Sequence, residues 1–127
     1  GNLTLLVHSL ASAYTPDLSE AILLLEDVGE EDYRLDRMFT ALRLAEPARR
    51  PAGLILGEFS ECAGAYVDQE AIAGFVAELA AELEIPAVTG FPVGHEERNL
   101  AVPMGTPGTI DADAGSVEFH ADATSEV

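Results

Sequence analysis

The sequence predicts an α/β fold in which a small mixed sheet is flanked by helices. Short apolar runs, typical of covered strands, alternate with longer segments in which apolar residues recur at helical spacing. Brief strand patterns separated by proline and glycine follow toward the C-terminal end. With 127 residues and no internal repeat, the chain is long enough for one compact domain. The order strand, helix, strand, helix, strand is typical of this fold class.

The first part of the chain predicts a strand between two helices. Asn2 can cap a helix with an apolar face, although Leu3, Leu5 and Val7 also alternate as in a strand; we predict the helix. Residues 21–25 are continuously apolar, which predicts a strand covered on both faces and ending at Glu26. A helix over 31–44 follows, because acids stand at its start and apolar residues recur at i, i+3, i+4 and i+7.

The second part predicts shorter elements. Residues 53–56 form a second buried strand, and Asp68 caps a helix whose apolar face ends at Leu83. A strand at 86–89 is followed by a loop over 90–98 that contains His95. We further predict brief strands at 100–102, 109–110 and 117–119, and a frayed tail over 120–127.

The composition excludes several classes of function. The chain has 23 acidic residues against six basic ones, all of them arginine, and a net charge of −17. Nucleic acids and anionic membrane surfaces both require clustered positive charge, so neither is an expected partner. The longest strongly apolar run, residues 21–25, is far shorter than the roughly 20 residues that span a membrane.

The same charge bears on the salt concentration in which the protein works. A strongly acidic surface fits a protein adapted to high salt, and genome composition is the alternative explanation for the missing lysines. One cysteine, Cys62, cannot form an internal disulfide, and the start does not resemble a signal peptide, so we expect a cytoplasmic protein. Because the sequence begins with Gly1 rather than Met, we expect a piece of a longer protein.

Two residues stand where functional side chains gather in α/β folds. Glu26 follows the apolar run at 21–25, at the carboxyl end of a predicted strand. His95 lies in a loop between glycine and glutamate, where backbone freedom can orient an imidazole. By position alone, an exposed loop acid and a surface histidine without a function are the more common interpretations.

Five segments carry a resemblance to a known family: GNLTLL at 1–6, LLEDVGE at 24–30, YRLDRM at 33–38, GEF at 57–59 and GFPVGH at 90–95. In this order they resemble the C-terminal domain of LD-carboxypeptidases, serine peptidases of the murein tetrapeptide carboxypeptidase and microcin-immunity type. The resemblance covers residues 1–119 and is most specific around Glu26 and His95. It implies a swivelling β/β/α domain, with the tail at 120–127 outside it.

The resemblance also implies a mechanism. In the family, an N-terminal domain supplies the serine nucleophile and the oxyanion hole, and the C-terminal domain supplies a glutamate and a histidine that match Glu26 and His95. The implied reaction cleaves the L,D-peptide bond to a terminal D-alanine in murein peptides, or a related amide in a toxic peptide–nucleotide conjugate. It uses no cofactor or metal. The family also favours homodimers.

The serine nucleophile is not expected in this sequence. No serine lies between glycines on a predicted strand-to-helix turn; the six are Ser9, Ser12, Ser19, Ser60, Ser116 and Ser125. We therefore expect a serine-bearing N-terminal domain outside this sequence, and no catalysis by this chain alone. The alternative is a stand-alone, non-catalytic domain of the same fold that binds a peptide or a partner chain.

Other candidates are weaker. Cys62 could pair with His95 as a thiol nucleophile, but a lone cysteine in this context is more often inert. His8, His95 and His120 show no metal-ligand spacing, so no metal site is expected. Asp36 and Arg37 suggest an ion pair or a domain contact, and Asn2 and Glu58 suit either structural roles or the edge of a cleft. The decisive expectation is that Glu26 and His95 lie close together on one face.

Overall fold

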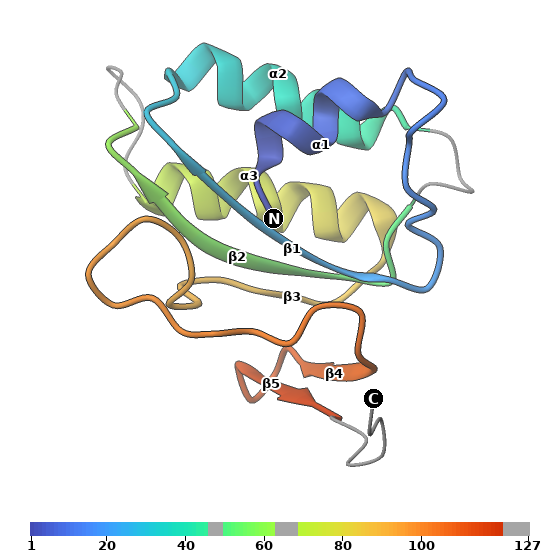
Figure 1. Cartoon of the computed structure of the whole chain (residues 1–127), viewed down its shortest axis with the longest axis vertical. Helices are drawn as coiled ribbons and strands as arrows, with labels where there is room; N and C mark the ends of the chain where they lie inside the picture. Colours follow the sequence, from blue (N-terminus) through green and yellow to red (C-terminus); the bar gives the residue numbers. More distant parts are fainter. Residues whose placement is uncertain (46–49, 63–68, 121–127) are drawn as a thin grey trace, which may run out of the picture.

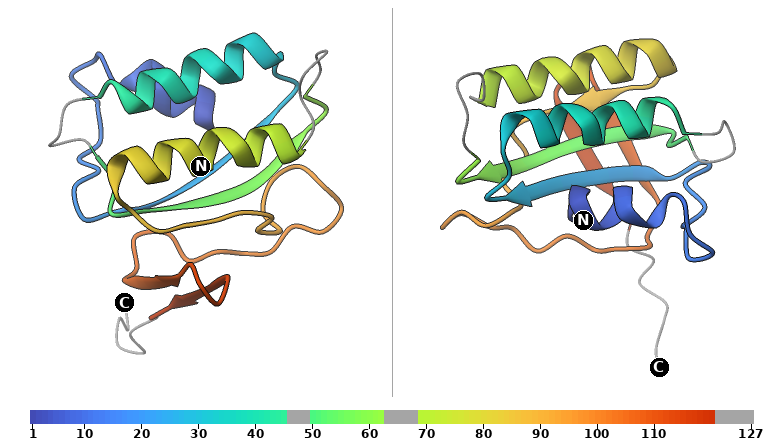
Figure 2. Two further views of the ribbon diagram at one scale, coloured as in Figure 1. Left: turned by 180° about the vertical axis from the view of Figure 1, so that it is seen from behind. Right: turned by 90° about the horizontal axis from the view of Figure 1, so that it is seen from above.

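The computed structural model describes residues 1–45, 50–62 and 69–120, and it places helices on one face of a small parallel sheet (Figure 1). The sheet consists of β1 (Ile22–Val28), β2 (Gly53–Ser60) and β3 (Ala87–Val88) in that order. Helix α1 (Leu3–Ser9) lies near β1 and α2 (Asp32–Arg43), and α2 packs beside α3 (Gln69–Leu83), as both views in Figure 2 show. Strands β4 (Gly108–Asp111) and β5 (Ser116–Phe119) form a separate antiparallel pair.

The apolar strands are buried on both faces, which explains their continuous hydrophobic runs. Successive side chains of a strand point to opposite faces, so Leu25 and Leu56 enter the helix-side core while Leu24 and Ile55 enter a second cluster. That second cluster packs against Ile22 of β1 and against apolar residues of the loop at 90–102 and of the β4–β5 hairpin: Phe91, Val93, Val102, Ile110, Val117 and Phe119.

The α/β fold class is confirmed, but the parallel and antiparallel strands form two separate sheets rather than the one mixed sheet that we predicted. All three predicted helices form, and Leu3 is the fully buried residue of the first. The expected cap at Asp68 falls outside the described residues.

Two predicted strands are too short. Strand β1 does not end at Glu26 but continues to Val28, and β2 continues to Ser60, because Asp27 and Val28 pair with Phe59 and Ser60. The prediction ended both strands too early because it followed hydrophobicity alone, and polar residues occur near the C-terminal ends of these strands.

The strand predicted at 100–102 is wrong, because that segment is irregular. The Leu100 amide donates to the Pro92 carbonyl, 2.8 Å away, which closes a loop rather than extending a sheet. Within the described residues, no helix is long and apolar enough to cross a membrane.

Candidate functional site

The structure brings Glu26 and His95 together, which confirms the expected proximity of the two side chains. Nδ1 of His95 lies 3.0 Å from Oε2 of Glu26. The Glu26 side chain is 12% exposed and the His95 side chain 52%, so the carboxylate is shielded while the imidazole faces solvent. Glu26 follows Leu24 by two positions on β1, and both line one hollow on the face opposite the helices.

An irregularity in the sheet occurs at Glu26. Between the pairs Leu25–Leu56 and Asp27–Phe59, β1 advances by two residues and β2 by three. The additional length contains Gly57 and Glu58, which match part of the sequence pattern at 57–59. A bulge of this kind bends a strand and changes the direction of nearby side chains, and it is common beside functional sites.

The segment before His95 docks on this irregular part of β2. The Phe91 amide donates to the Leu56 carbonyl at 3.0 Å, and the Glu58 amide donates to the Val93 carbonyl at 2.7 Å. A Cβ atom at Gly57 would lie 2.4 Å from the Val93 carbonyl oxygen, so only glycine permits this approach. The strand therefore positions the loop that carries the histidine.

The loop itself is closed by two further contacts. The Gly94 amide donates to Oδ1 of Asn99 at 3.3 Å, and the Leu100 amide donates to the Pro92 carbonyl. Gly94 has φ +154°, and a Cβ atom there would lie 2.7 Å from Cβ of Glu58. Glycine at position 94 thus allows the backbone next to His95 to pack directly on β2.

The geometry defines the chemical roles that the pair can play. A carboxylate oxygen only accepts hydrogen bonds, so a neutral His95 ring facing Glu26 through Nδ1 carries its proton there, leaving Nε2 as the base. The 3.0 Å separation is an ion-pair distance, but Oε2 of Glu26 is buried and accepts no hydrogen bond of good geometry within the described residues. Catalytic hydrogen bonds are often long or poorly aligned before the reacting partners assemble.

The pair lies at an open hollow of about 260 Å³. One wall is apolar and includes Leu100 and Met104, whose side chains are exposed. Asn99 and Gly1 complete the polar part of the lining.

The other sequence candidates lie elsewhere. Burial raises the pKa of the Cys62 thiol, and the Asp27 and Glu30 carboxylates near it act in the same direction. Such a thiol is a poor nucleophile. In the part of the chain that the structure describes, His95 makes a polar contact with Glu26 alone, and no three potential ligands cluster as a metal site.

Three further candidates have structural roles. The Arg37 guanidinium lies 5.1 Å from the centre of the Tyr33 ring, a cation–π contact, and the domain contact expected for Asp36 and Arg37 stays a prediction. Oδ1 of Asn2 caps α1 by accepting from the Leu5 amide at 3.0 Å. Glu58 contributes its backbone to the docking of the His95 loop.

Sequence reasoning missed Asp27, which is 2% exposed and accepts several hydrogen bonds. It also missed Asn99, which holds the loop that carries His95. A polar residue inside a strand was the available signal for Asp27, but the prediction had ended that strand one residue earlier.

Comparison with known proteins identifies the family. A family model described as the LD-carboxypeptidase C-terminal domain matches residues 1–110. The chain belongs to the LD-carboxypeptidase family. A Synechocystis protein whose carboxypeptidase name is provisional is 39% identical over 127 residues, covering 94% of this chain and 40% of that protein.

Solved structures agree with this LD-carboxypeptidase assignment. Muramoyltetrapeptide carboxypeptidase from Oxalobacter formigenes superimposes with a TM-score of 0.73 and 32% identity over 94% of this chain and 42% of its own. The microcin C7 self-immunity protein MccF superimposes with a TM-score of 0.77 and 26% identity over 98% of this chain and 37% of its own. Structures of MccF include complexes with glutamyl sulfamoyl guanosine and aspartyl sulfamoyl adenosine. The chain therefore spans about two fifths of the length of these relatives.

Proposed function

We propose that the protein containing this domain is a serine-type carboxypeptidase that hydrolyses the L,D-peptide bond to a terminal D-alanine in murein peptides. Family membership and the similarity to a muramoyltetrapeptide carboxypeptidase support the reaction class. The observation that carries the proposal is the 3.0 Å contact between the Glu26 carboxylate and Nδ1 of His95.

In the proposed mechanism His95 is the general base and Glu26 orients it. A serine hydroxyl is weakly nucleophilic until a neighbouring imidazole takes its proton, which Nε2 of His95 would accept. The Glu26 carboxylate fixes the tautomer that leaves Nε2 free, and it stabilises the imidazolium after proton transfer. His95 then returns the proton to the leaving amine.

The serine and the oxyanion donors would come from an N-terminal domain beyond the sequence described here. The face around Glu26 and His95 suits such a partner, because the imidazole is half-exposed and the wall formed by Leu100 and Met104 presents apolar surface. We propose that this face docks the serine domain and forms one side of the substrate cleft. It would also contribute apolar contacts to the bound peptide.

A second substrate class follows from the similarity to MccF. Aminoacyl sulfamoyl nucleosides bind to that protein, and an amide joining an amino acid to a nucleotide could be cleaved by the same three groups. The cleft half supplied by the N-terminal domain would distinguish these substrates. We place the protein in the cytoplasm, where the one cysteine of this domain would stay reduced.

Release of D-alanine from an L,D-tetrapeptide tests the proposal. We expect turnover by the whole protein and none by residues 1–127, because the nucleophile is supplied by the other domain. An aminoacyl sulfamoyl nucleoside, assayed in parallel, tests the second substrate class. A whole protein without a serine domain would instead support the non-catalytic alternative. Turnover by the isolated chain that persists in His95→Ala would refute the proposed triad.

A further inference from the structure

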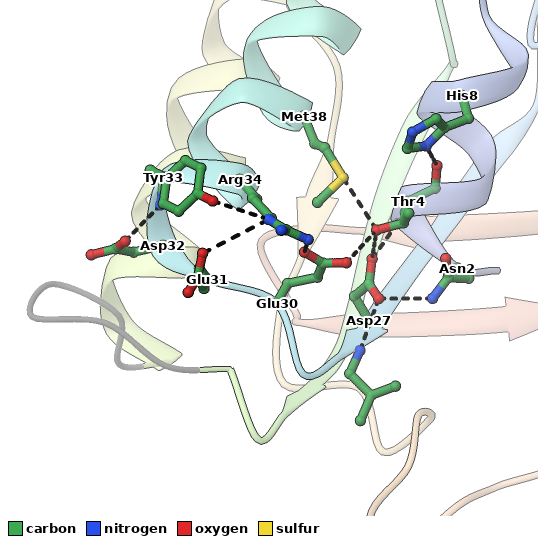
Figure 3. Close-up of polar contacts among 11 residues, drawn as sticks. Asn2, Thr4, His8, Asp27, Glu30, Glu31, Asp32, Tyr33, Arg34 and Met38 are labelled. Atoms are coloured by element: carbon green, nitrogen blue, oxygen red, sulfur yellow. Dashed lines mark hydrogen bonds and ion pairs between the residues drawn. The ribbon is translucent and has the colours of Figure 1, made fainter.

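A buried carboxylate lies directly beside Glu26 in sequence but on the other face of β1. Asp27 is 2% exposed and points toward α1, where it is surrounded by polar partners (Figure 3). Burying a carboxylate is costly unless hydrogen bonds replace its water. Hydrogen bonds to the Asp27 carboxylate replace its lost water. Among the described residues, no cationic side chain contacts this carboxylate.

Among the described residues, four hydrogen-bond donors contact the Asp27 carboxylate. Oδ1 accepts from Nδ2 of Asn2 at 2.8 Å and from the Val28 amide at 2.9 Å. Oδ2 accepts from the Thr4 amide at 2.9 Å and lies 2.8 Å from the Thr4 hydroxyl, whose single proton is shared between Asp27 and Oε1 of Glu30, 3.0 Å away. Both oxygens thus act as acceptors, Oδ1 of two hydrogen bonds and Oδ2 of the Thr4 amide bond, as a carboxylate does and a primary amide cannot. An asparagine would direct its NH₂ group at a donor in either orientation.

These contacts fix the backbone on both sides of Glu26. The Gly1 backbone nitrogen donates to the Leu24 carbonyl, the Glu26 amide donates to the Gly1 carbonyl at 3.2 Å, and Asn2 forms a parallel bridge with Glu26. Asp27 holds the other end of the same segment through Asn2 and Thr4. Because side chains alternate along a strand, anchoring Asp27 on the helix face directs Glu26 to the face that carries His95.

We propose that Asp27 is a positioning residue for the Glu26–His95 pair. Its carboxylate ties the start of α1 to the end of β1, and the orientation of Glu26 depends on that tie. The inference rests on the proposed function, since it concerns the same site. Removal of the Asp27 carboxylate then uncouples His95 from Glu26 without removing either side chain.

The histidine tautomer measures this coupling in the isolated chain. Long-range ¹H–¹⁵N NMR spectra, recorded at about pH 8 where histidine side chains are mostly neutral, show which ring nitrogen carries the proton. His8→Ala, His95→Ala and His120→Ala assign the three signals. In the unaltered chain we expect His95 to carry its proton on Nδ1, and in Glu26→Gln we expect it to lose that preference.

Asp27→Asn should change the His95 signal in the same direction as Glu26→Gln. Thr4→Val removes one donor to Asp27 and should give a smaller change, which Thr4→Ser should restore. Asp17→Asn is the matched control, because Asp17 also accepts from a backbone amide and a hydroxyl, those of Ser19, but lies in an exposed turn. Leu79→Ala is the control for lost stability, since Leu79 is buried in α3.

The outcomes separate the inference from the proposed function. A His95 tautomer that changes in Glu26→Gln but not in folded Asp27→Asn or Thr4→Val overturns the positioning role. So does an equal change in Leu79→Ala, or no change in Glu26→Gln. In the whole protein we expect Asp27→Asn to lower kcat by up to about 100-fold with little change in KM. Absence of D-alanine release by the unaltered whole protein would refute the proposed function alone.

Discussion

At the scale of single residues, two glycines determine where the His95 side chain can lie. Gly57 and Gly94 allow the backbone of one segment to pack directly against the other, and the Val93 carbonyl is the shared contact of Gly57 and the Glu58 amide. The position of His95 therefore depends on residues that carry no functional group. The close packing of the two segments gives a structural reason for the glycines in the sequence patterns at 57–59 and 90–95.

Gly57→Ala should displace the His95 loop, because its Cβ atom would lie 2.4 Å from the Val93 carbonyl oxygen. We expect a loss of about 1–3 kcal/mol in the free energy of unfolding, typical of an overpacked site. Urea unfolding checks the result. Gly74→Ala is the control, since nothing lies within 4 Å of its Cβ position in α3, and it should stabilise by up to about 1 kcal/mol. Equal effects of both substitutions would contradict the docking of this loop.

Cys62 provides a pH prediction. Burial raises the pKa of its thiol, so the protonated form is favoured in the folded state. The corresponding stability is fully present below the pKa of the unfolded thiol, about 8.5, and is lost as pH rises through the higher folded value. Alkylation by iodoacetamide at neutral pH should be slower in the folded chain than in urea. A folded chain that reacts as fast as the unfolded one would restore Cys62 as a candidate nucleophile.

At the scale of secondary structure, hydrophobic periodicity predicts the helices well. The apolar stripe at Leu35, Met38, Phe39 and Leu42 is buried in α2 as expected. Strand limits were less predictable, because Asp27 and Ser60 are polar yet buried at strand ends. The segment at 100–102 was misassigned because Val102 packs against the sheet as part of a loop, whereas Leu100 is exposed and its amide donates to the Pro92 carbonyl.

The functional site, like the secondary structure, could be predicted from the sequence only in part. Glu26 and His95 could be nominated from their family motifs and from strand ends, but the support from Asp27 and Asn99 could not. Those contacts depend on the approach of residues distant in sequence, such as Thr4 to Asp27. Neither hydrophobic pattern nor local turn signals contain that information.

Helix α1 gives a test of the packing that supports Asp27. Leu3 is fully buried and Leu5 is 72% exposed, although both lie in the first turn of one helix. Leu3→Ala should lower the free energy of unfolding by about 2–5 kcal/mol. Leu5→Ala should change it by no more than about 0.5 kcal/mol. Similar losses in a denaturant titration would show that the helix packs through a different face.

At the scale of the whole molecule, charge repulsion opposes folding. The net charge of −17 is spread over a chain of 127 residues with six arginines. Such repulsion weakens as the Debye length falls from about 10 Å at 0.1 M salt to about 3 Å at 1 M. Dissolved salt should therefore contribute to the stability of this domain.

We expect the melting temperature to rise steadily with NaCl between these concentrations. A parallel series with sucrose, which stabilises by exclusion without screening charge, separates the two effects. A melting temperature that is insensitive to NaCl would assign the absence of lysine to genome composition rather than to adaptation to high salt.

The central claim is that Glu26 and His95 act as one unit on a serine from another domain. Release of D-alanine by the whole protein, measured for Glu26→Gln, His95→Ala and the double variant, tests it most directly, with Glu96→Gln as an exposed neighbouring control. We predict a loss in kcat of about 10⁴-fold for Glu26→Gln. The double variant should lose no more than His95→Ala alone, since residues that act together are not additive. Multiplied losses in the double variant, or near-normal turnover by His95→Ala, would contradict the claim.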